Sequence, residues 1–237
     1  MRNSKNLLKM ITLSMLIALG VVISPILRVE GMCPMAHFIN IVCSVFLGPW
    51  YSLLCATLIG IIRMLTMGIP PIALTGAVFG AFLSGVFYRL SKGRIIFAVL
   101  GEIIGTGIIG AIMSYPVMTF LWGKEGLSWL FYVPSFICGT LIGGSIAYVF
   151  LRKFAANGML VKIQTMLGSV GYTDHVSLLS NTLTIAALGG ILFVVFELAT
   201  DIFSLTGPVW DKASYISLGI CGIAALVYYI TKKVKVN

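Results

Sequence analysis

Three ionisable side chains, His37, Arg63 and Glu102, interrupt long apolar stretches in the first 155 residues. Such groups are costly inside a membrane, so they are candidates for a functional site. Asn40 follows His37 at i,i+3, which puts both on one face of a helix. Together the four could line a polar pocket for a small heterocycle. Each ionisable residue also has a plainer interpretation: an interfacial histidine, an arginine extending to the outer membrane surface, or a glutamate bonding two helices.

Sequence motifs of several enzyme and metal sites are absent. The chain has no G-x-x-x-x-G-K-[ST] loop for ATP, no H-E-x-x-H and no G-x-S-x-G. It has two histidines, His37 and His175, so we do not expect a multi-histidine metal site. A membrane-embedded enzyme would need a paired catalytic constellation, for which Glu102 and His37 are the candidates. The sequence therefore predicts no enzyme, no metal and no cofactor.

Glycines recur at spacings that suit close helix packing. Gly105, Gly107 and Gly110 spell G-x-G-x-x-G, but they lie inside an apolar helix and follow no strand, which argues against a nucleotide loop. Small residues four apart let helix backbones touch in a membrane. Such pairs are Gly76 and Gly80, Gly101 and Gly105, Gly139 and Gly143, and, in the first apolar run, Ser14 and Ala18.

The elements that position these residues must lie in lipid. Of 237 residues, 59% are hydrophobic and 10% are charged, whereas a soluble domain carries about 25% charged residues. Such a chain cannot cover a water-facing surface. Its 16 Lys and Arg outnumber 7 Asp and Glu. They form short clusters between apolar runs, which is typical of membrane proteins with basic cytoplasmic loops.

The apolar runs predict eight spanning helices, because a span needs about 20 apolar residues. We place them near residues 7–27, 34–48, 49–67, 70–90, 94–121, 128–154, 175–200 and 213–231. Residues 34–67 could instead form one long helix. Gly48-Pro49 argues for two, since proline removes a backbone donor and clashes with the preceding turn. The first of these two helices is then short.

Charge favours the same division. With two helices, 12 of the 16 basic residues fall on one side: Arg2, Lys5, Lys9, Arg89, Lys92, Arg94, Arg152, Lys153, Lys162, Lys232, Lys233 and Lys235. Merging the two helices leaves 6 of 16 on the side of the N-terminus. Because cytoplasmic loops are rich in Lys and Arg, we predict a multi-pass protein of the bacterial cytoplasmic membrane with both termini in the cytoplasm.

The predicted fold class is an all-α integral membrane protein in three parts. Residues 1–155 form a six-helix unit that holds the candidate pocket. Residues 156–174 break the apolar pattern and form a cytoplasmic linker, in which residues 159–167 could be a short helix at the membrane surface. Residues 175–237 form a two-helix extension of unknown role.

A series of short runs carries a resemblance to a known family. The runs are His37-Phe38-Ile39-Asn40, Leu47-Gly48-Pro49-Trp50-Tyr51, Gly60-Ile61-Ile62-Arg63, Gly76-Ala77-Val78-Phe79-Gly80-Ala81, Gly101-Glu102-Ile103-Ile104-Gly105-Thr106-Gly107 and Ser114-Tyr115-Pro116-Val117. Over about residues 5–154 the chain resembles the S components of energy-coupling-factor (ECF) vitamin transporters. It resembles most the ThiW type, which is assigned to the thiazole precursor of thiamine.

This resemblance implies a six-helix substrate-binding subunit that works with a transmembrane coupling protein and two cytoplasmic ATPases. It implies hydroxyethylthiazole as the ligand, and we expect His37, Asn40, Arg63 and Glu102 to form its site. An S component for another vitamin or precursor is an alternative, since residues 72–76 depart from the Phe-Pro-Gly-type run usual in the family.

The resemblance also implies a docking surface. The cytoplasmic part of the first helix, with Ser14 and Ala18, would contact the coupling protein, although the family usually has alanine at both positions. The missing ATP loop fits a subunit whose ATPases are other chains. The alternative from another class is a stand-alone secondary transporter of a small heterocycle, which an internal repeat would favour; we see none in the sequence.

Overall fold

The computed structural model describes residues 2–26, 33–172 and 210–234, together with short stretches between 178 and 207. Every regular element in these residues is a helix, which confirms the all-α fold class. The chain divides into two compact units, Met1–Asp174 and His175–Asn237. Within the described residues, six helices are long and apolar enough to cross a membrane.

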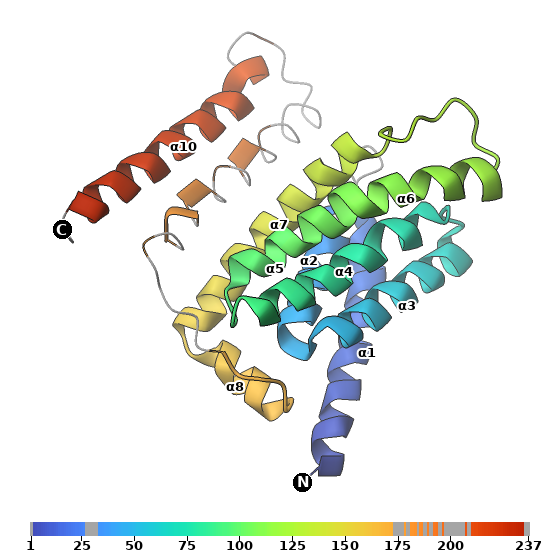
Figure 1. Cartoon of the computed structure of the whole chain (residues 1–237), viewed down its shortest axis with the longest axis horizontal. Helices are drawn as coiled ribbons and strands as arrows, with labels where there is room; N and C mark the ends of the chain where they lie inside the picture. Colours follow the sequence, from blue (N-terminus) through green and yellow to red (C-terminus); the bar gives the residue numbers. More distant parts are fainter. Residues whose placement is uncertain are drawn as a thin grey trace. The chain divides into compact units, whose positions relative to one another are not determined.

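The first unit is a bundle of six apolar helices followed by a short one (Figure 1). The bundle helices are α1 (Arg2–Ile26), α2 (Pro34–Leu47), α3 (Pro49–Met67), α4 (Ile72–Leu90), the continuous span α5 (Ile95–Glu102), η1 (Ile103–Gly110), α6 (Ala111–Pro116) and η2 (Val117–Leu121), and α7 (Val133–Ala156). They agree closely with the first six predicted spans. The largest differences are at the starts of α1 and α7, where apolar pattern alone defines a boundary poorly.

The break between α2 and α3 falls at Gly48, as predicted. Its backbone has φ 92° and ψ 179°, a conformation that an L side chain rarely adopts and glycine adopts readily. Pro49 then starts α3, where its missing N–H costs no helical hydrogen bond. The sequence Gly-Pro therefore ends one helix and begins the next with no loop between them.

Helix α2 is the buried centre of the unit. It packs against α1, α3, α4 and α7, and 12 of its 14 residues are buried. It is shorter than the roughly 20 residues that a full span needs, and its neighbours shield it. The polar residues His37 and Asn40 consequently face protein.

The unit has two distinct ends. Lys9 Nζ of α1 lies 5.7 Å from the ring centroid of Tyr51 at the start of α3, so α1 runs parallel to α3. One end thus holds the start of α1, the α2–α3 junction, the turn between α4 and α5, and the end of α7. We call it the basic end, because Lys9, Arg89, Lys92, Arg94, Arg152 and Lys153 belong to it. The opposite end, with residues 68–71 and 122–132, is the loop end.

Glycine packing between α4 and η1 explains the glycine pairs. A Cβ built on Gly105 would lie 2.5 Å from the Gly80 Cα, a distance that no real side chain tolerates. The two backbones therefore touch, and the interpretation of G-x-G-x-x-G as a packing motif is confirmed. This contact brings α4 directly against the segment that carries Glu102.

After α7, residues 157–172 turn back onto the basic end of the same unit. They include α8 (Met159–Met166), which packs against α7 and α2. The segment predicted as a linker is thus an ordered part of the first unit, with Gln164 completely buried.

The second unit contains α10 (Trp210–Val234), which matches the last predicted span. Asn181 donates a hydrogen bond to the Tyr228 hydroxyl at 3.3 Å. The predicted span at 175–200 lies mostly outside the described residues.

Candidate functional site

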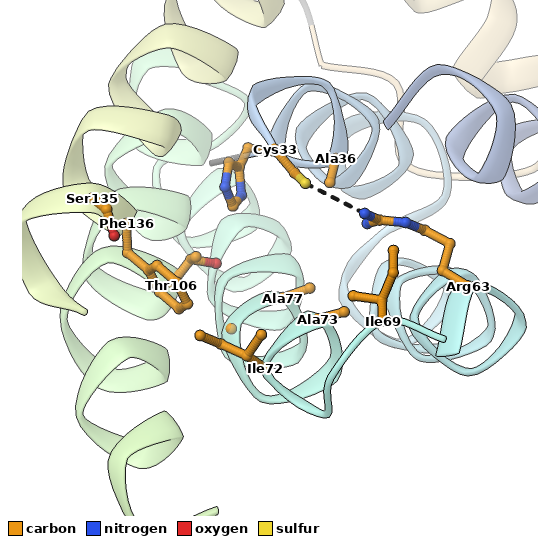
Figure 2. Close-up of a pocket in the computed structure, with 12 residues that line it drawn as sticks. Cys33, Ala36, Arg63, Ile69, Ile72, Ala73, Ala77, Thr106, Ser135 and Phe136 are labelled. Carbon is orange, nitrogen blue, oxygen red and sulfur yellow. Dashed lines mark hydrogen bonds between the residues drawn. The ribbon is translucent and has the colours of Figure 1, made fainter. Parts of the chain in front are cut away.

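A cavity of about 70 Å³ opens at the loop end of the first unit. This volume is several times the roughly 10–15 Å³ that one water needs. Figure 2 shows Arg63 on one side, Thr106 and Phe136 on the other, and Ile72, Ala73 and Ala77 between them. The lining residues come from the start of α2, the end of α3, α4, η1 and the start of α7: Cys33, Ala36, His37, Arg63, Ile69, Ile72, Ala73, Gly76, Ala77, Thr106, Ser135 and Phe136.

Behind this lining, Glu102 at the end of α5 collects hydrogen bonds from α2 and from η1. Its Oε1 lies 2.9 Å from His37 Nδ1, and it accepts hydrogen bonds from Asn40 Nδ2 at 3.0 Å and Thr106 Oγ1 at 3.1 Å. Glu102 has 0% exposure. A buried carboxyl group needs such partners, and here they tie α2 to the end of α5.

This arrangement determines which edge of the His37 ring is left for a ligand. Because Asn40 and Thr106 both donate to Glu102 Oε1, that oxygen is an acceptor, and His37 Nδ1 fits it as a third donor. A hydrogen bond at one ring nitrogen sets the tautomer and therefore the role of the other. His37 lines the cavity, and in the neutral imidazole Nε2, on the far edge of the ring, is then the acceptor that a bound molecule can use.

Two buried polar atoms at the site have no hydrogen-bond partner among the described residues: Arg63 Nε and Glu102 Oε2. Arg63 is only 3% exposed, and its Nη2 donates a hydrogen bond to Cys33 Sγ at 3.3 Å. Glu102 Oε2 faces Gly80, where an added Cβ would lie 2.8 Å from it. Unsatisfied buried groups cost free energy, and Arg63, which lines the cavity, retains donors for a ligand.

A stretch of π-helix lies next to this network. The η1 segment begins directly after Glu102 and contains Thr106. In membrane and soluble proteins, π-helical turns inside an α-helix are rare and occur often at functional sites. Here the wider turn accompanies the contact between Glu102 and the Thr106 hydroxyl.

The four predicted site residues form two layers. His37 and Arg63 line the cavity, whereas Asn40 and Glu102 lie outside its lining, and Glu102 Oε1 joins Asn40 to His37. Sequence reasoning missed Thr106, Ser135 and Phe136. The position of Thr106, four residues after Glu102, was the available signal for it; Ser135 and Phe136 carried none.

The predicted docking residues lie apart from the cavity. Ser14 and Ala18 are exposed on α1, while Leu13, Leu16 and Ser24 of the same helix are buried. The small-residue face of α1 therefore points away from the bundle. Among the described residues, no group of three or more His, Cys, Asp or Glu could hold a metal ion.

Apolar spans around a cavity with a few polar side chains in its wall define a multi-pass membrane protein with a candidate site for a small molecule. The family model for the thiamine-precursor transporter protein (ThiW) matches residues 10–157, which include every residue of the cavity. The chain therefore belongs to the ThiW family of thiamine-precursor transporters. This confirms the resemblance carried by the short runs. No curated protein and no solved structure was found to match the chain.

Proposed function

We propose that this chain is the substrate-binding subunit of an ECF-type importer for hydroxyethylthiazole, the thiazole precursor of thiamine. One observation carries the proposal: a buried carboxyl group orients His37 at the wall of an otherwise apolar cavity. Apolar pockets with a few well-placed polar groups are the usual form of small-molecule sites. Membership of the ThiW family supports a thiamine precursor as the ligand.

The chemistry of the lining suits a thiazole alcohol. Its ring nitrogen is an acceptor, which the unused donors of Arg63 can satisfy. Its hydroxyl group can donate to His37 Nε2. Phe136 and Ile72 offer apolar surface to the ring faces. A neutral heterocycle of this kind requires two or three hydrogen bonds and no opposite charge.

Asn40 and Glu102 act as positioning residues in this proposal. They hold the His37 ring through Glu102 Oε1 and need not touch the ligand. Thr106 belongs to both layers, because it lines the cavity and donates to the same carboxyl oxygen. The specificity for a thiazole then depends on how rigidly Asn40, Glu102 and Thr106 hold the His37 ring.

Ligand affinity tests the site. Losing one buried hydrogen-bond partner costs about 1–3 kcal/mol, or about ten- to hundredfold in affinity. We expect His37→Ala and Asn40→Ala each to weaken hydroxyethylthiazole binding by that factor, measured by calorimetry on the purified protein. Thr57→Val is the control, since the Thr57 hydroxyl bonds only to Leu53 O of its own helix. Unchanged affinity in both test variants would contradict the proposed site.

The second part of the proposal is the coupling module. The sequence has no ATP-binding loop, so energy would come from a transmembrane coupling protein and two ATPases. The small, outward-facing residues Ser14 and Ala18 permit close approach of another helix. We propose this face of α1 as the docking surface.

A bulky substitution separates docking from binding. We expect Ala18→Trp to abolish uptake by whole cells and to leave hydroxyethylthiazole affinity within about twofold, because the added ring blocks helix approach. Leu65→Trp, at an exposed position of α3, is the control and should transport normally. Uptake that needs no ATPase would instead identify a secondary transporter.

A further inference from the structure

A second cavity, of about 230 Å³, lies at the basic end of the first unit. It shares no lining residue with the first cavity, and none of its lining residues belongs to the Glu102 network. The start of α1, the α2–α3 junction, the end of α4 and the residues after α8 contribute to it: Lys9, Leu47, Trp50, Tyr51, Arg89, Gly168, Ser169 and Val170.

The wall formed by residues 168–170 is fixed by buried hydrogen bonds. Gln164 Nε2 donates to Val45 O at 2.8 Å and to the Tyr88 hydroxyl at 3.0 Å. Ser169 Oγ donates to Phe46 O at 2.5 Å. These bonds satisfy carbonyl groups in the last turn of α2, which have no partner within the helix. The cavity is consequently a built feature of the unit.

Two cationic side chains line this cavity. Lys9 Nζ lies over the Tyr51 ring. The Arg89 guanidinium covers Gly48, where an added Cβ would collide with it, and the Lys5 side chain lies beside Gly168. In the part of the chain that the structure describes, no acidic residue lines the cavity. Like charges held near one another repel, so an anion bound between them is stabilised.

An apolar surface adjoins the cationic cavity. Trp50 lines the cavity and is 68% exposed, and Leu54 is exposed one turn further along α3. The Trp50 ring packs against Phe82 of α4, with ring centroids 5.0 Å apart. Tryptophan is enriched where a membrane protein crosses the lipid headgroup region. A ligand with an anionic head and an apolar tail would match this combination.

We propose that this cavity binds the phosphate group of an anionic phospholipid. Basic pockets between membrane helices bind such headgroups, and each Lys or Arg near the surface strengthens the attraction. The phosphate lies between Lys9 and Arg89, with Ser169 as a neutral donor, and the acyl chains follow the Trp50–Leu54 face of α3. A free phosphate compound offers the same anionic group without the chains.

Lipid retention tests this site on the full-length protein. The protein is reconstituted in vesicles of phosphatidylglycerol and phosphatidylcholine in equal parts, extracted into detergent, and weighed by native mass spectrometry. We expect wild type to retain phosphatidylglycerol, and Lys9→Gln with Arg89→Gln to lower that retention about tenfold or more. Lys9→Gln alone changes one partly exposed side chain and so disturbs the fold less. We expect it to lower phosphatidylglycerol retention by less than the double variant does. Lys162→Gln on α8 is the matched control, because it removes a positive charge outside the cavity.

The competing outcomes are distinct. Displacement of the lipid by millimolar inorganic phosphate would support the phosphate site and assign it to a free anion. Equal retention of both lipids by wild type would overturn the proposal. So would an equal loss in the control and the double variant. A double variant that retains lipid but no longer assembles with a coupling protein would overturn it in favour of a protein-binding surface.

Discussion

The first unit contains two buried polar networks, one beside the first cavity and one at the basic end, and they differ in how completely their hydrogen bonds are satisfied. Glu102, beside the cavity, and Gln164, at the basic end, both have 0% exposure. Gln164 donates twice through Nε2, and its Oε1 accepts from Tyr172 N at 3.2 Å. At Glu102, Oε1 accepts three hydrogen bonds while Oε2 has none among the described residues.

This difference distinguishes a polar network that stabilises the fold from one that can bind a ligand. A fully satisfied network holds elements in one arrangement and offers nothing to a ligand. A network beside a cavity, with spare donors such as those of Arg63 and the free edge of His37, keeps hydrogen-bonding capacity for another molecule. Glu102 and Gln164 are both fully buried, so burial alone does not distinguish a structural network from a ligand-binding one. The comparison predicts that substitutions in the Glu102 network lower ligand affinity, whereas substitutions in the Gln164 network lower stability and leave affinity unchanged.

The largest expected effect is at Glu102. Glu102→Ala removes the acceptor of His37, Asn40 and Thr106 at once. With each lost partner costing about 1–3 kcal/mol, we expect hydroxyethylthiazole affinity to fall by about a hundredfold or more. Glu102→Gln retains a side-chain oxygen for these donors, and its loss should stay within about tenfold. Calorimetry on both variants measures the difference.

The Glu102→Gln variant also tests whether misfolding explains a loss of ligand affinity in Glu102→Ala. It keeps the size of the side chain, so the α2–α5 contact should survive, as thermal unfolding of the empty protein will report. If Glu102→Ala binds the ligand within about threefold of wild type, the carboxyl group does not orient the site. The Glu102 network could then no longer be assigned to ligand binding, in contrast to the Gln164 network.

Much of the fold could be predicted from the sequence, because membrane spans depend on local composition. Apolar length located the first six helices and α10, and Gly48-Pro49 located a helix break inside a continuous apolar run. The basic clusters suggested which helix ends lie together. The orientation of these ends relative to the cytoplasm stays a prediction, as does the span at 175–200.

The site was predictable only in part. His37, Asn40, Arg63 and Glu102 stood out because charge and amide groups are rare in apolar helices. Their division into cavity lining and supporting layer depends on contacts between α2 and α5, 62 or more residues apart in the chain. Phe136 resembles many other aromatic residues of the spans. Gln164 was assigned to a linker, since a polar residue in a polar segment gives no sign of burial.

The smaller expected effect, on stability alone, is at Gln164. Gln164→Met keeps the volume of the side chain but removes the hydrogen bonds of Gln164 to the buried Val45 O and to Tyr172 N. An unsatisfied buried group costs about 1–3 kcal/mol, and each kcal/mol shifts Tm by about 2–4 °C in a unit of this size. Counting Val45 O alone, we therefore expect thermal unfolding about 2–12 °C below wild type, with hydroxyethylthiazole affinity within about twofold. Thr165→Ala, at an exposed position of the same helix, should change neither quantity. A large loss of affinity in Gln164→Met would mean that the basic end communicates with the cavity, and the two networks could not be assigned separate roles.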